Sequence, residues 1–335
     1  MSGAGATTAG AAGSARTGDV REGFAYGHME QIQRARILAA AVHAVCELGV
    51  ADLTVANVVE RAGVSRRTFY ELFGSCEACL LATLEDALAR TRERVLPAYE
   101  REQGAWRRRM RAGLLALLEF FDERPQVARL LIVEWLASGP RALERRRQVL
   151  ERIASAVDEG RTARLAVGSG PPQLTAEGVV GAVASVLHGR LARAQPGPAL
   201  VELVNPLMGI VVLPYLGTAA ARGELEQTVP ASRTHAGAEL SPEDTLRGLK
   251  MRLTYRTLQV LAAVAEFPGS SNRAIARAAG VGDQGQISKL LMRLCKLGLL
   301  ENNGMVRKGE PNAWSLTVRG EQVERALRIS SEGKV

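Results

Sequence analysis

Aromatic residues and cysteines are scarce in this chain, and no long hydrophobic run is uninterrupted. Phe, Trp and Tyr make up 4% of the 335 residues, while hydrophobic residues make up 47%, so we expect helices packed through Ala, Leu and Val. Four cysteines provide no disulfide framework for a chain of this length. The most apolar stretch, Leu203–Ala221, contains Asn205, Pro206 and Pro214, which argues against a membrane-spanning helix.

Motifs for catalysis are missing as well. The sequence has no Gly-rich phosphate loop, no nucleophile elbow and no cluster of zinc ligands. Its four histidines lie in unrelated segments, at His28, His43, His188 and His235. We therefore predict that the protein is not an enzyme and needs no cofactor or metal. The N-terminus also lacks the basic-then-apolar order of a signal peptide, so a cytoplasmic location is expected.

Composition and helical periodicity divide the chain into segments. Residues 2–15 contain only Gly, Ala, Ser and Thr, a composition that cannot bury a core and predicts disorder. The predicted segments are an N-terminal tail (1–27), a helix-turn-helix domain (28–96), a helical domain (97–222), a linker (223–246), a second small domain (247–322) and a C-terminal tail (323–335).

A helix-turn-helix pattern occupies residues 54–73. Thr54 has the position of an N-cap, Gly63 ends the first short helix, and Ser65 caps the next one. A recognition helix contacts bases and phosphates near its N-terminal end, and an ordinary helical hairpin with a solvated arginine pair is the alternative. The residues expected at DNA are Thr54, Ser65, Arg66, Arg67, Thr68 and Tyr70.

Residues 33–96 resemble the N-terminal domain of TetR-type transcriptional regulators. The matching residues are Thr54-Val55, Val58, Ala62-Gly63-Val64-Ser65, Thr68-Phe69-Tyr70 and Phe73, preceded by an amphipathic helix over Arg36–Leu48. Leu72 and Cys76 depart from the family pattern, which often has His and Lys there, both touching the DNA backbone. The resemblance therefore implies a DNA-binding domain with weaker phosphate anchoring than usual.

A second helix-turn-helix pattern, independent of the first, occupies residues 271–297. Asn272–Ala279 forms a short amphipathic helix that Gly280 stops. Asp283 and Gln286 then have the spacing of a capping box. The following helix places four apolar residues on one face, namely Ile287, Leu290, Leu291 and Leu294.

Short strand patterns follow this second pair of helices. Leu299–Glu301, the turn Asn303-Gly304 and Met305–Arg307 predict a hairpin, and Ala313–Thr317 predicts a further strand. This order resembles a winged helix of the MarR type. The matching residues are Leu294, Leu297-Gly298-Leu299-Leu300, Leu316-Thr317 and Gly320. Winged helices also serve as dimerisation or protein-contact modules, which is the alternative here.

Positive charge is concentrated in the second pattern. Residues 247–320 contain 12 Lys and Arg against 4 Asp and Glu, whereas residues 28–95 contain 8 against 9. A basic surface attracts phosphate, so we expect the C-terminal domain to touch double-stranded DNA. The expected contacts are Gln284, Gln286, Ser288, Lys289 and Arg293 on the helix, and Arg307 and Lys308 on the wing.

The segment between the two patterns is predicted to be all-helical. Its helices are expected over Arg107–Phe121, Gln126–Ala137, Ala142–Arg164, Ala176–Arg193 and Ala199–Gly217. The stretch Arg129–Trp135 resembles the regulatory domain of TetR-type proteins. That resemblance implies a small-molecule effector and a homodimer formed through the last two of these helices.

Polar residues within the apolar helices are the candidates for the effector pocket. The candidate set is Phe120, Phe121, Glu134, Trp135 and His188. Alternatively, Glu134 is a buried, paired acid and His188 a dimer-interface residue. Cys76 and Cys79 fall at a helix start, where the dipole lowers the pKa of a thiol. Redox control of DNA docking and simple packing of two small residues are both open there.

The predicted fold class is mainly α: a TetR-type three-helix DNA-binding domain, an all-helical regulatory and dimerisation domain, and a small α+β winged helix. The predicted function is a sequence-specific transcriptional regulator, more a repressor than an activator, that an effector releases from DNA. An architectural protein that bridges distant DNA sites is the competing class. Preference for one palindrome over random DNA distinguishes the two.

Overall fold

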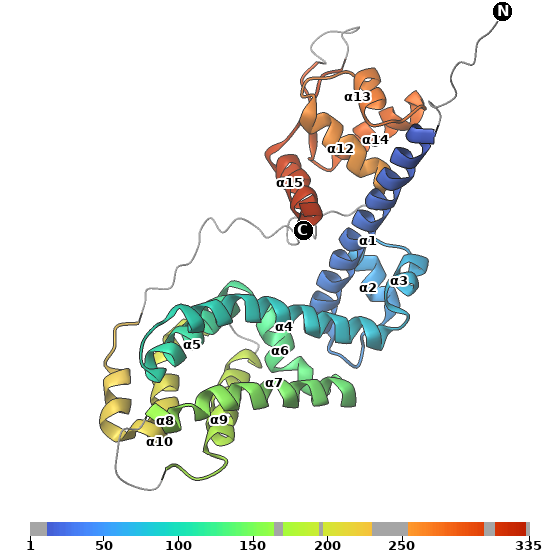
Figure 1. The fold of residues 1–335 in the computed structure, drawn as a ribbon. Helices are drawn as coiled ribbons and strands as arrows, with labels where there is room; N and C mark the ends of the chain where they lie inside the picture. Colours follow the sequence, from blue (N-terminus) through green and yellow to red (C-terminus); the bar gives the residue numbers. More distant parts are fainter. Residues whose placement is uncertain (1–11, 164–169, 194–196, 230–253, 305–311, 333–335) are drawn as a thin grey trace, which may run out of the picture. The chain divides into compact units, whose positions relative to one another are not determined.

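The computed structural model describes residues 12–163, 170–193, 197–229, 254–304 and 312–332. These residues fold mainly into α-helices, with one two-stranded sheet (Figure 1). They form two compact units. One unit holds α2, nearly all of α3 and the C-terminal elements from α12 onward, and the other holds α4 to α10, while α1 contributes to both.

Helix α1 (Ala12–Leu48) begins much earlier than the sequence suggested. The tail predicted over residues 1–27 is helical from Ala12 onward, whereas the predicted helix started at Arg36. The composition of this segment does not show that it continues a helix formed by the residues that follow. A helix that is already nucleated extends at little cost, because each added residue gains one backbone hydrogen bond.

The predicted helix-turn-helix pair is present as α2 (Val55–Ala62) and α3 (Arg66–Phe73). The turn between the two helices has a glycine with positive φ, Gly63 at 63°, a conformation that residues with a Cβ adopt reluctantly. The Ser65 hydroxyl accepts a hydrogen bond from the Thr68 amide at 3.0 Å, as expected of an N-cap. Val58 and Phe69 are fully buried.

The second unit is all-helical in the residues described. Its elements are α4 (Cys76–Arg101), α5 (Trp106–Glu123), α6 (Pro125–Ile132), η1 (Glu134–Ala137), α7 (Pro140–Asp158), α8 (Gly160–Ala163), α9 (Thr175–Leu191), η2 (Leu200–Leu203) and α10 (Val204–Leu225). Helix α4 packs along α5, and α9 packs against α6, α7 and α10. One hydrophobic cluster, rich in Leu, Val and Ala, runs through the unit.

Several element boundaries differ from those predicted. Helix α4 continues through Pro97, so the boundary expected between residues 96 and 97 lies inside a helix. An interior proline costs about 3 kcal/mol, and the packing of α4 along α5 offsets it. The helices predicted over Gln126–Ala137 and Ala142–Arg164 are each interrupted, at Val133 and Glu159 respectively.

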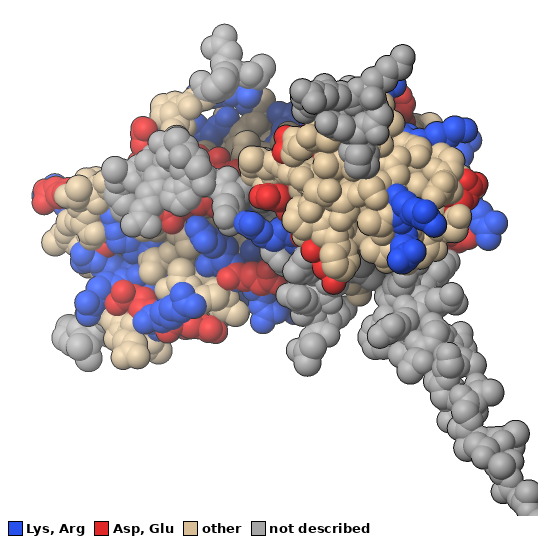
Figure 2. All heavy atoms as spheres, turned by 90° about the horizontal axis from the view of Figure 1, so that it is seen from above, with Lys and Arg blue, Asp and Glu red and all other residues tan. Residues whose placement is uncertain are grey.

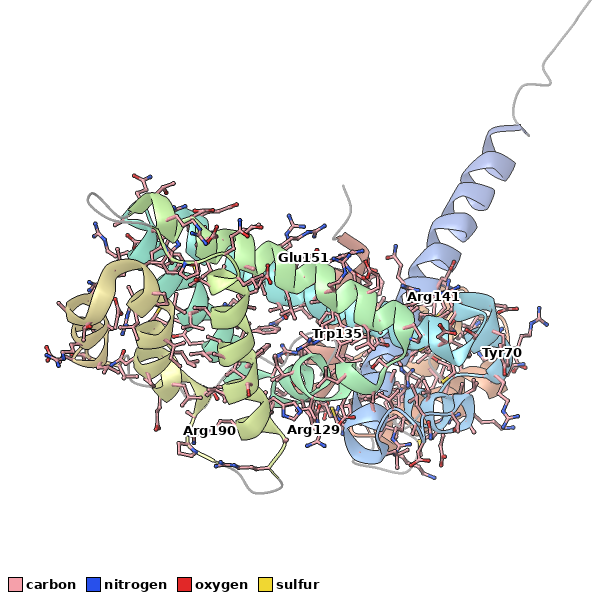
Figure 3. The ribbon with its side chains drawn as sticks, turned by 90° about the horizontal axis from the view of Figure 1, so that it is seen from below. Tyr70, Arg129, Trp135, Arg141, Glu151 and Arg190 are labelled. Carbon is pink, nitrogen blue, oxygen red and sulfur yellow. The ribbon has the colours of Figure 1, made fainter. Side chains whose placement is uncertain are left out.

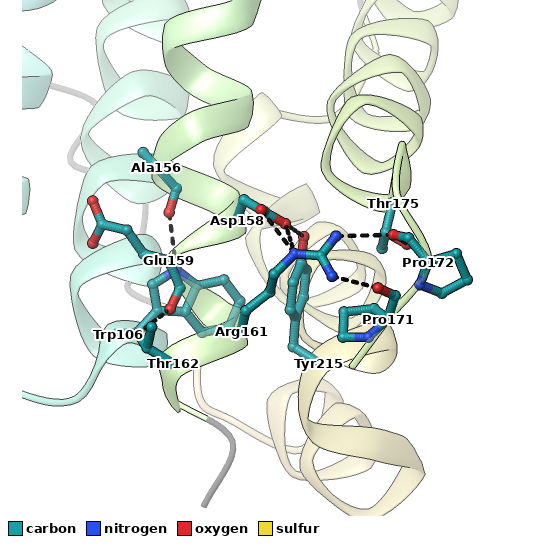
Figure 4. Close-up of polar contacts among 10 residues, drawn as sticks. All are labelled: Trp106, Ala156, Asp158, Glu159, Arg161, Thr162, Pro171, Pro172, Thr175 and Tyr215. Carbon is teal, nitrogen blue, oxygen red and sulfur yellow. Dashed lines mark hydrogen bonds and ion pairs between the residues drawn. The ribbon is translucent and has the colours of Figure 1, made fainter. Parts of the chain in front are cut away.

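The break at Glu159 is held by a cluster of polar contacts (Figure 4). The Arg161 guanidinium pairs with Asp158 at 2.6 Å and donates to the carbonyl oxygens of Pro171 and Pro172. The Tyr215 hydroxyl donates to the same Asp158 carboxylate at 3.3 Å. These contacts tie α7, α8 and α10 to the segment that leads into α9, so the chain turns here for a local physical reason that helical periodicity does not capture.

The apolar segment Leu200–Leu225 is long and hydrophobic enough to cross a membrane by length and composition, but 56% of its most apolar window is buried inside the fold. Within α10, Asn205 accepts from Arg111 at 2.5 Å, and Glu224 accepts from the same guanidinium at 2.7 Å. Glu224 is fully buried. These features describe a core helix of the second unit. Helix α10 also reaches three residues into the predicted linker, and residues 230–246 of that linker lie outside the described residues.

The C-terminal elements are α12 (Tyr255–Glu266), α13 (Asn272–Ala278), α14 (Gln284–Lys296), β1 (Leu300–Asn302), β2 (Trp314–Leu316) and α15 (Val318–Glu332). The strands pair antiparallel, with Glu301 opposite Ser315. The strand predicted over Met305–Arg307 lies outside the described residues. Helix α15 also extends beyond residue 322, where the sequence predicted the start of a tail.

Glycine at position 320 has a steric cause. A Cβ at Gly320 would lie 2.0 Å from the carbonyl oxygen of Leu299, so only glycine fits where the first turn of α15 passes the residue before β1. Thr317 completes the junction, because its hydroxyl donates to the Gly298 carbonyl at 2.6 Å and accepts from the Gly320 amide at 3.0 Å. The motif residues Gly298, Thr317 and Gly320 are therefore joined by hydrogen bonds at one junction.

Candidate nucleic-acid interface

The outer face of α3 carries the predicted contact residues. Arg66, Arg67 and Tyr70 are exposed, and Tyr70 retains 53% of its accessible surface. Tyr70 is labelled in Figure 3. The Tyr70 ring lies edge-on to buried Phe69, with the ring centroids 5.6 Å apart. Helix α3 therefore exposes two guanidinium groups and one phenol, whose ring packs against the buried Phe69 ring.

Arg67 is paired within α3. Its Nε lies 2.7 Å from Glu71 Oε1, and the two side chains are 88% and 51% exposed. Exposed pairs of this kind contribute less than about 1 kcal/mol. Arg67 can therefore exchange Glu71 for a phosphate or a base edge at little cost.

Thr54, Ser65 and Thr68 are placed differently from the arginines. Thr54 is exposed immediately before α2. The Ser65 and Thr68 hydroxyls lie 2.7 Å apart and are half-buried. Because the Ser65 hydroxyl also caps α3, these two residues serve first to form the N-terminal end of the helix.

The thiols at the start of α4 do not have the environment that the sequence suggested. Ser75 caps α4 by accepting from the Ala78 amide at 3.1 Å. Cys76 donates to the Leu53 carbonyl, and burial raises the pKa of its thiol rather than lowering it. Cys79 is fully buried. Desolvation therefore outweighs the helix dipole here, and the expectation of a lowered thiol pKa is wrong for Cys76.

Helix α14 carries the second set of predicted contacts. Gln284, Lys289 and Arg293 are exposed along it. Asp283 caps the helix by accepting from the amides of Gly285 and Gln286 at 2.8 and 3.2 Å, and these bonds lower the pKa of its carboxyl. The first turn of α14 is therefore well formed, with its amides facing a residue that stays negatively charged.

Other predicted contacts in this region have partners within the domain. Gln286 accepts a hydrogen bond from Arg256 on α12. The Ser288 hydroxyl accepts from Asn272 at 2.9 Å and donates to the Gln284 carbonyl at 3.0 Å. Arg307 and Lys308, predicted on the wing, lie outside the described residues.

Sequence reasoning missed some exposed cations near α14. Arg256 at the start of α12 is exposed and bonds Gln286, and Arg273 and Arg277 are exposed on α13. The only available signal was the excess of basic residues over 247–320, which says nothing of which side chains share a surface. On the face of the molecule seen in Figure 2, Lys and Arg side chains stand among Asp and Glu.

The residues predicted for an effector pocket divide into two groups. Phe120, Phe121 and Trp135 are buried in the core of the second unit, and the Trp135 indole N–H donates to the Ala142 carbonyl at 2.8 Å. Glu134 is 11% exposed and pairs with Arg129 at 3.1 Å. The pairing agrees with the alternative of a largely buried, paired acid.

Arg129 connects the pair with Glu134 to the helix that carries His188. Its guanidinium also donates to the Leu191 carbonyl at the C-terminal end of α9, at 3.5 Å. His188 is half-buried on the preceding turn of that helix. The cation Arg129, which Figure 3 labels, is thus a polar residue at this junction that the sequence did not single out.

The first helix-turn-helix is similar to a known family of proteins. Residues 37–83 match the family model described as "Bacterial regulatory proteins, tetR family". The match covers the end of α1, both α2 and α3, and the start of α4. In sequence and in element order, this part of the chain is therefore similar to the helix-turn-helix domain of the tetR family.

Curated relatives are similar in sequence to only part of this chain. The chain is 33% identical over 110 residues to the HTH-type transcriptional regulator BetI of Escherichia coli O127:H6, covering 32% of this chain and 54% of the relative. The BetI of Escherichia coli K12 is 32% identical over the same shares. The chain spans about half the length of the curated relatives it matches.

Two solved structures resemble a larger part of the chain. The fatty acid degradation regulator FadR of Bacillus halodurans aligns with a TM-score of 0.48 at 16% identity, over 53% of this chain and 94% of that one. FadR of Bacillus subtilis, solved in complex with stearoyl-CoA, aligns with a TM-score of 0.47 at 18% identity, over 55% and 98%. Both scores are too low to support a functional comparison.

Proposed function

We propose that this protein is a cytoplasmic, sequence-specific DNA-binding transcriptional regulator of the TetR type, acting as a repressor. The observation that carries the proposal is the α2–α3 pair, whose outer face exposes Arg66, Arg67 and Tyr70 and whose sequence matches the tetR family. Helix α3 enters the major groove with its N-terminal residues at the base edges.

Selection from a random pool of DNA duplexes tests this function. The full-length protein is expected to enrich one inverted repeat, because two recognition helices related by a two-fold axis contact two equal half-sites. An Arg66→Ala/Arg67→Ala double variant should lose that enrichment. Binding of all duplexes without a shared sequence would instead support the architectural alternative.

The homodimer is formed through α9 and α10. An unbroken line of small residues is exposed along α9, namely Gly178, Gly181, Ala182, Ser185 and Gly189. A Cβ at any of the three glycines would meet open space. On α10, Leu213 is 48% exposed. Small side chains let two helices approach closely, and an apolar rim favours burial against a second copy.

The second unit senses a small effector that releases the protein from DNA. What supports this is the polar junction where Arg129 joins Glu134 to the end of α9, with His188 nearby on the same helix. Such isolated polar groups among apolar helices orient small ligands. An effector acts only if it binds one dimer geometry more tightly than the other.

Thermal unfolding in the presence of a metabolite library tests the sensor. A compound that binds the folded state raises the melting temperature, and the effector should also lower DNA affinity. His188→Ala should weaken that compound's effect on the melting temperature, while Ser155→Ala at an exposed position of α7 should not. If no compound that stabilises the protein changes its DNA affinity, the sensor proposal fails.

The C-terminal domain is a winged helix that also binds DNA. Helix α14 follows α13 in helix-turn-helix order, the β1–β2 pair follows α14, and Lys289 and Arg293 are exposed on α14. In this assignment Gln284 and Gln286 face the major groove. Arg307 and Lys308 lie outside the described residues, and they stay predicted contacts to the flanking DNA backbone. A role in protein contact, the second candidate, does not require exposed cations along α14.

A further inference from the structure

The C-terminal domain contains a polar network centred on one side chain, Asn272, at the start of α13. Its Oδ1 accepts from the indole Nε1 of Trp314 at 2.6 Å and from Asn312 Nδ2 at 3.0 Å. Its Nδ2 donates to the Ser288 hydroxyl on α14 at 2.9 Å. One amide therefore joins α13, the recognition helix α14, strand β2 and the residue Asn312 before that strand.

The direction of each bond in this network follows from Trp314. An indole N–H can only donate, and Trp314 is 1% exposed, so Asn272 must turn its oxygen toward the ring. The amide nitrogen of Asn272 is then left facing Ser288. The Ser288 hydroxyl accepts that bond and donates its own hydrogen to the Gln284 carbonyl.

The same chain of bonds continues to the loop end of the β1–β2 pair, where β1 ends and the chain returns toward β2. Asn312 uses its nitrogen on Asn272, so its oxygen is free to accept from Asn302 Nδ2 at 2.8 Å. Asn302 Oδ1 in turn accepts from the backbone amides of Ala313 and Gly304 at 2.9 and 3.2 Å. Each side-chain amide thus has one orientation, which fixes the loop end of the β1–β2 pair relative to α14.

We propose that Asn272 is a positioning residue for DNA binding, which holds α14 and the loop end of the β1–β2 pair in one fixed relation. Ser288 is the anchor of α14 in this arrangement, and it does not contact a base. The inference rests on the proposed DNA binding by the C-terminal domain. Pre-organised contact residues bind more tightly because less freedom is lost on binding.

A double-mutant cycle in the full-length protein tests the role of Asn272. The probe is the duplex that the wild-type protein enriches most strongly from the random pool. Arg293→Ala should weaken binding about tenfold in the wild type, as for one charged hydrogen bond. In the Asn272→Ala background, Arg293→Ala should weaken DNA binding about threefold or less, since Arg293 is no longer held toward the phosphate.

The outcomes separate the two proposals. Equal losses from Arg293→Ala in both backgrounds overturn the positioning role and leave DNA binding by the domain standing. If Arg293→Ala has no effect in the wild type, DNA binding by this domain is contradicted, and the role of Asn272 falls with it. A purely stabilising role for Asn272 predicts additive effects, so the cycle discriminates where a single variant does not.

Circular dichroism shows whether the Asn272→Ala protein is folded. If it is not, a milder variant takes its place. Ser288→Ala removes only the bond to α14 and leaves the Trp314 and Asn312 bonds to Asn272 in place. It should lower affinity about 5-fold, the contribution of one hydrogen bond, and should show the same coupling to Arg293→Ala. Ser315→Ala on β2 is the matched control. It should change neither the affinity for the duplex nor the effect of Arg293→Ala. Absence of coupling in the Ser288→Ala cycle also overturns the proposal.

Discussion

At the scale of single residues, α3 separates side chains that build the helix from side chains that face outward. Ser65 and Thr68 share a hydrogen bond at the N-terminus, whereas Arg66 and Tyr70 have outward-facing surface. Capping chemistry is local in sequence, so the role of Ser65 could be predicted. The pairing of Gln286 with Arg256 joins residues 30 positions apart, and no local pattern indicates it.

Arg67→Ala should weaken binding to the selected duplex by about 1–3 kcal/mol if the guanidinium makes a bidentate base contact. The loss should be smaller on random DNA, because a base contact adds specificity rather than general affinity. Fluorescence anisotropy with both duplexes measures the difference. Arg152→Ala, an exposed arginine on α7, is the control. Unchanged affinity of a folded Arg67→Ala protein removes Arg67 from the interface.

Mild peroxide should leave DNA affinity unchanged. Burial raises the pKa of the Cys76 thiol, and that of Cys46 to about 11, so little thiolate is present near neutral pH to react. Iodoacetamide labelling followed by mass spectrometry should show slower modification of both than of free cysteine. A loss of DNA binding after peroxide that a reductant restores, and that Cys76→Ser abolishes, would support redox control instead.

The free energy of unfolding should fall as the pH rises from about 9 to about 11. In that window the unfolded chain releases the Cys46 proton, whose ordinary pKa is 9.0, while the folded protein keeps it up to a pKa of about 11. Urea unfolding across the window should show a shallower decline for Cys46→Ala than for the wild type. Parallel declines would contradict a raised pKa at this thiol.

At the scale of elements, periodicity located helices better than it located their ends. The predicted helix Ala176–Arg193 matches α9 closely, because its apolar residues repeat over four turns. The breaks at Val133 and Glu159 were not predicted, since they depend on contacts such as Arg161 with the Pro171 and Pro172 carbonyls. The start of α1 at Ala12 could likewise not be predicted from the composition of residues 2–15.

Ala182→Arg should convert the homodimer to monomers. The change places a long, charged side chain within the line of small exposed residues on α9, where the proposed interface leaves room only for close helix approach. Light scattering coupled to size-exclusion chromatography gives the mass of each variant. Ser155→Arg introduces the same side chain at an exposed position of α7, and this variant should remain dimeric. A dimeric Ala182→Arg protein would place the interface elsewhere.

At the scale of the whole molecule, charge differs between the two helix-turn-helix segments. The segment 28–95 is close to neutral, and 247–320 is strongly basic. This contrast needs only the sequence and predicts that the C-terminal domain supplies much of the salt-sensitive affinity. How the basic side chains share a surface needs the fold, which brings Arg256 to Gln286 at the start of α14.

Lys289→Ala/Arg293→Ala/Lys296→Ala in the full chain should lower the slope of log affinity against log salt by about 0.9 for each phosphate that the protein no longer neutralises. Binding of the selected duplex over a salt series measures the slope. Arg141→Ala/Arg147→Ala/Arg152→Ala removes the same charge from exposed positions on α7 and should change the slope little. Equal slopes in the two triple variants would favour a protein-contact role for the C-terminal domain.

The central claim is that α3 directs this protein to particular DNA sequences. Genome-wide mapping of bound sites in the organism of origin, for the wild type and for Arg66→Ala/Arg67→Ala, tests it most directly. We expect discrete sites that share one inverted repeat in the wild type, and loss of those sites in the variant with the protein still folded and present. Sites without a common sequence, or the same map for both proteins, would contradict the claim.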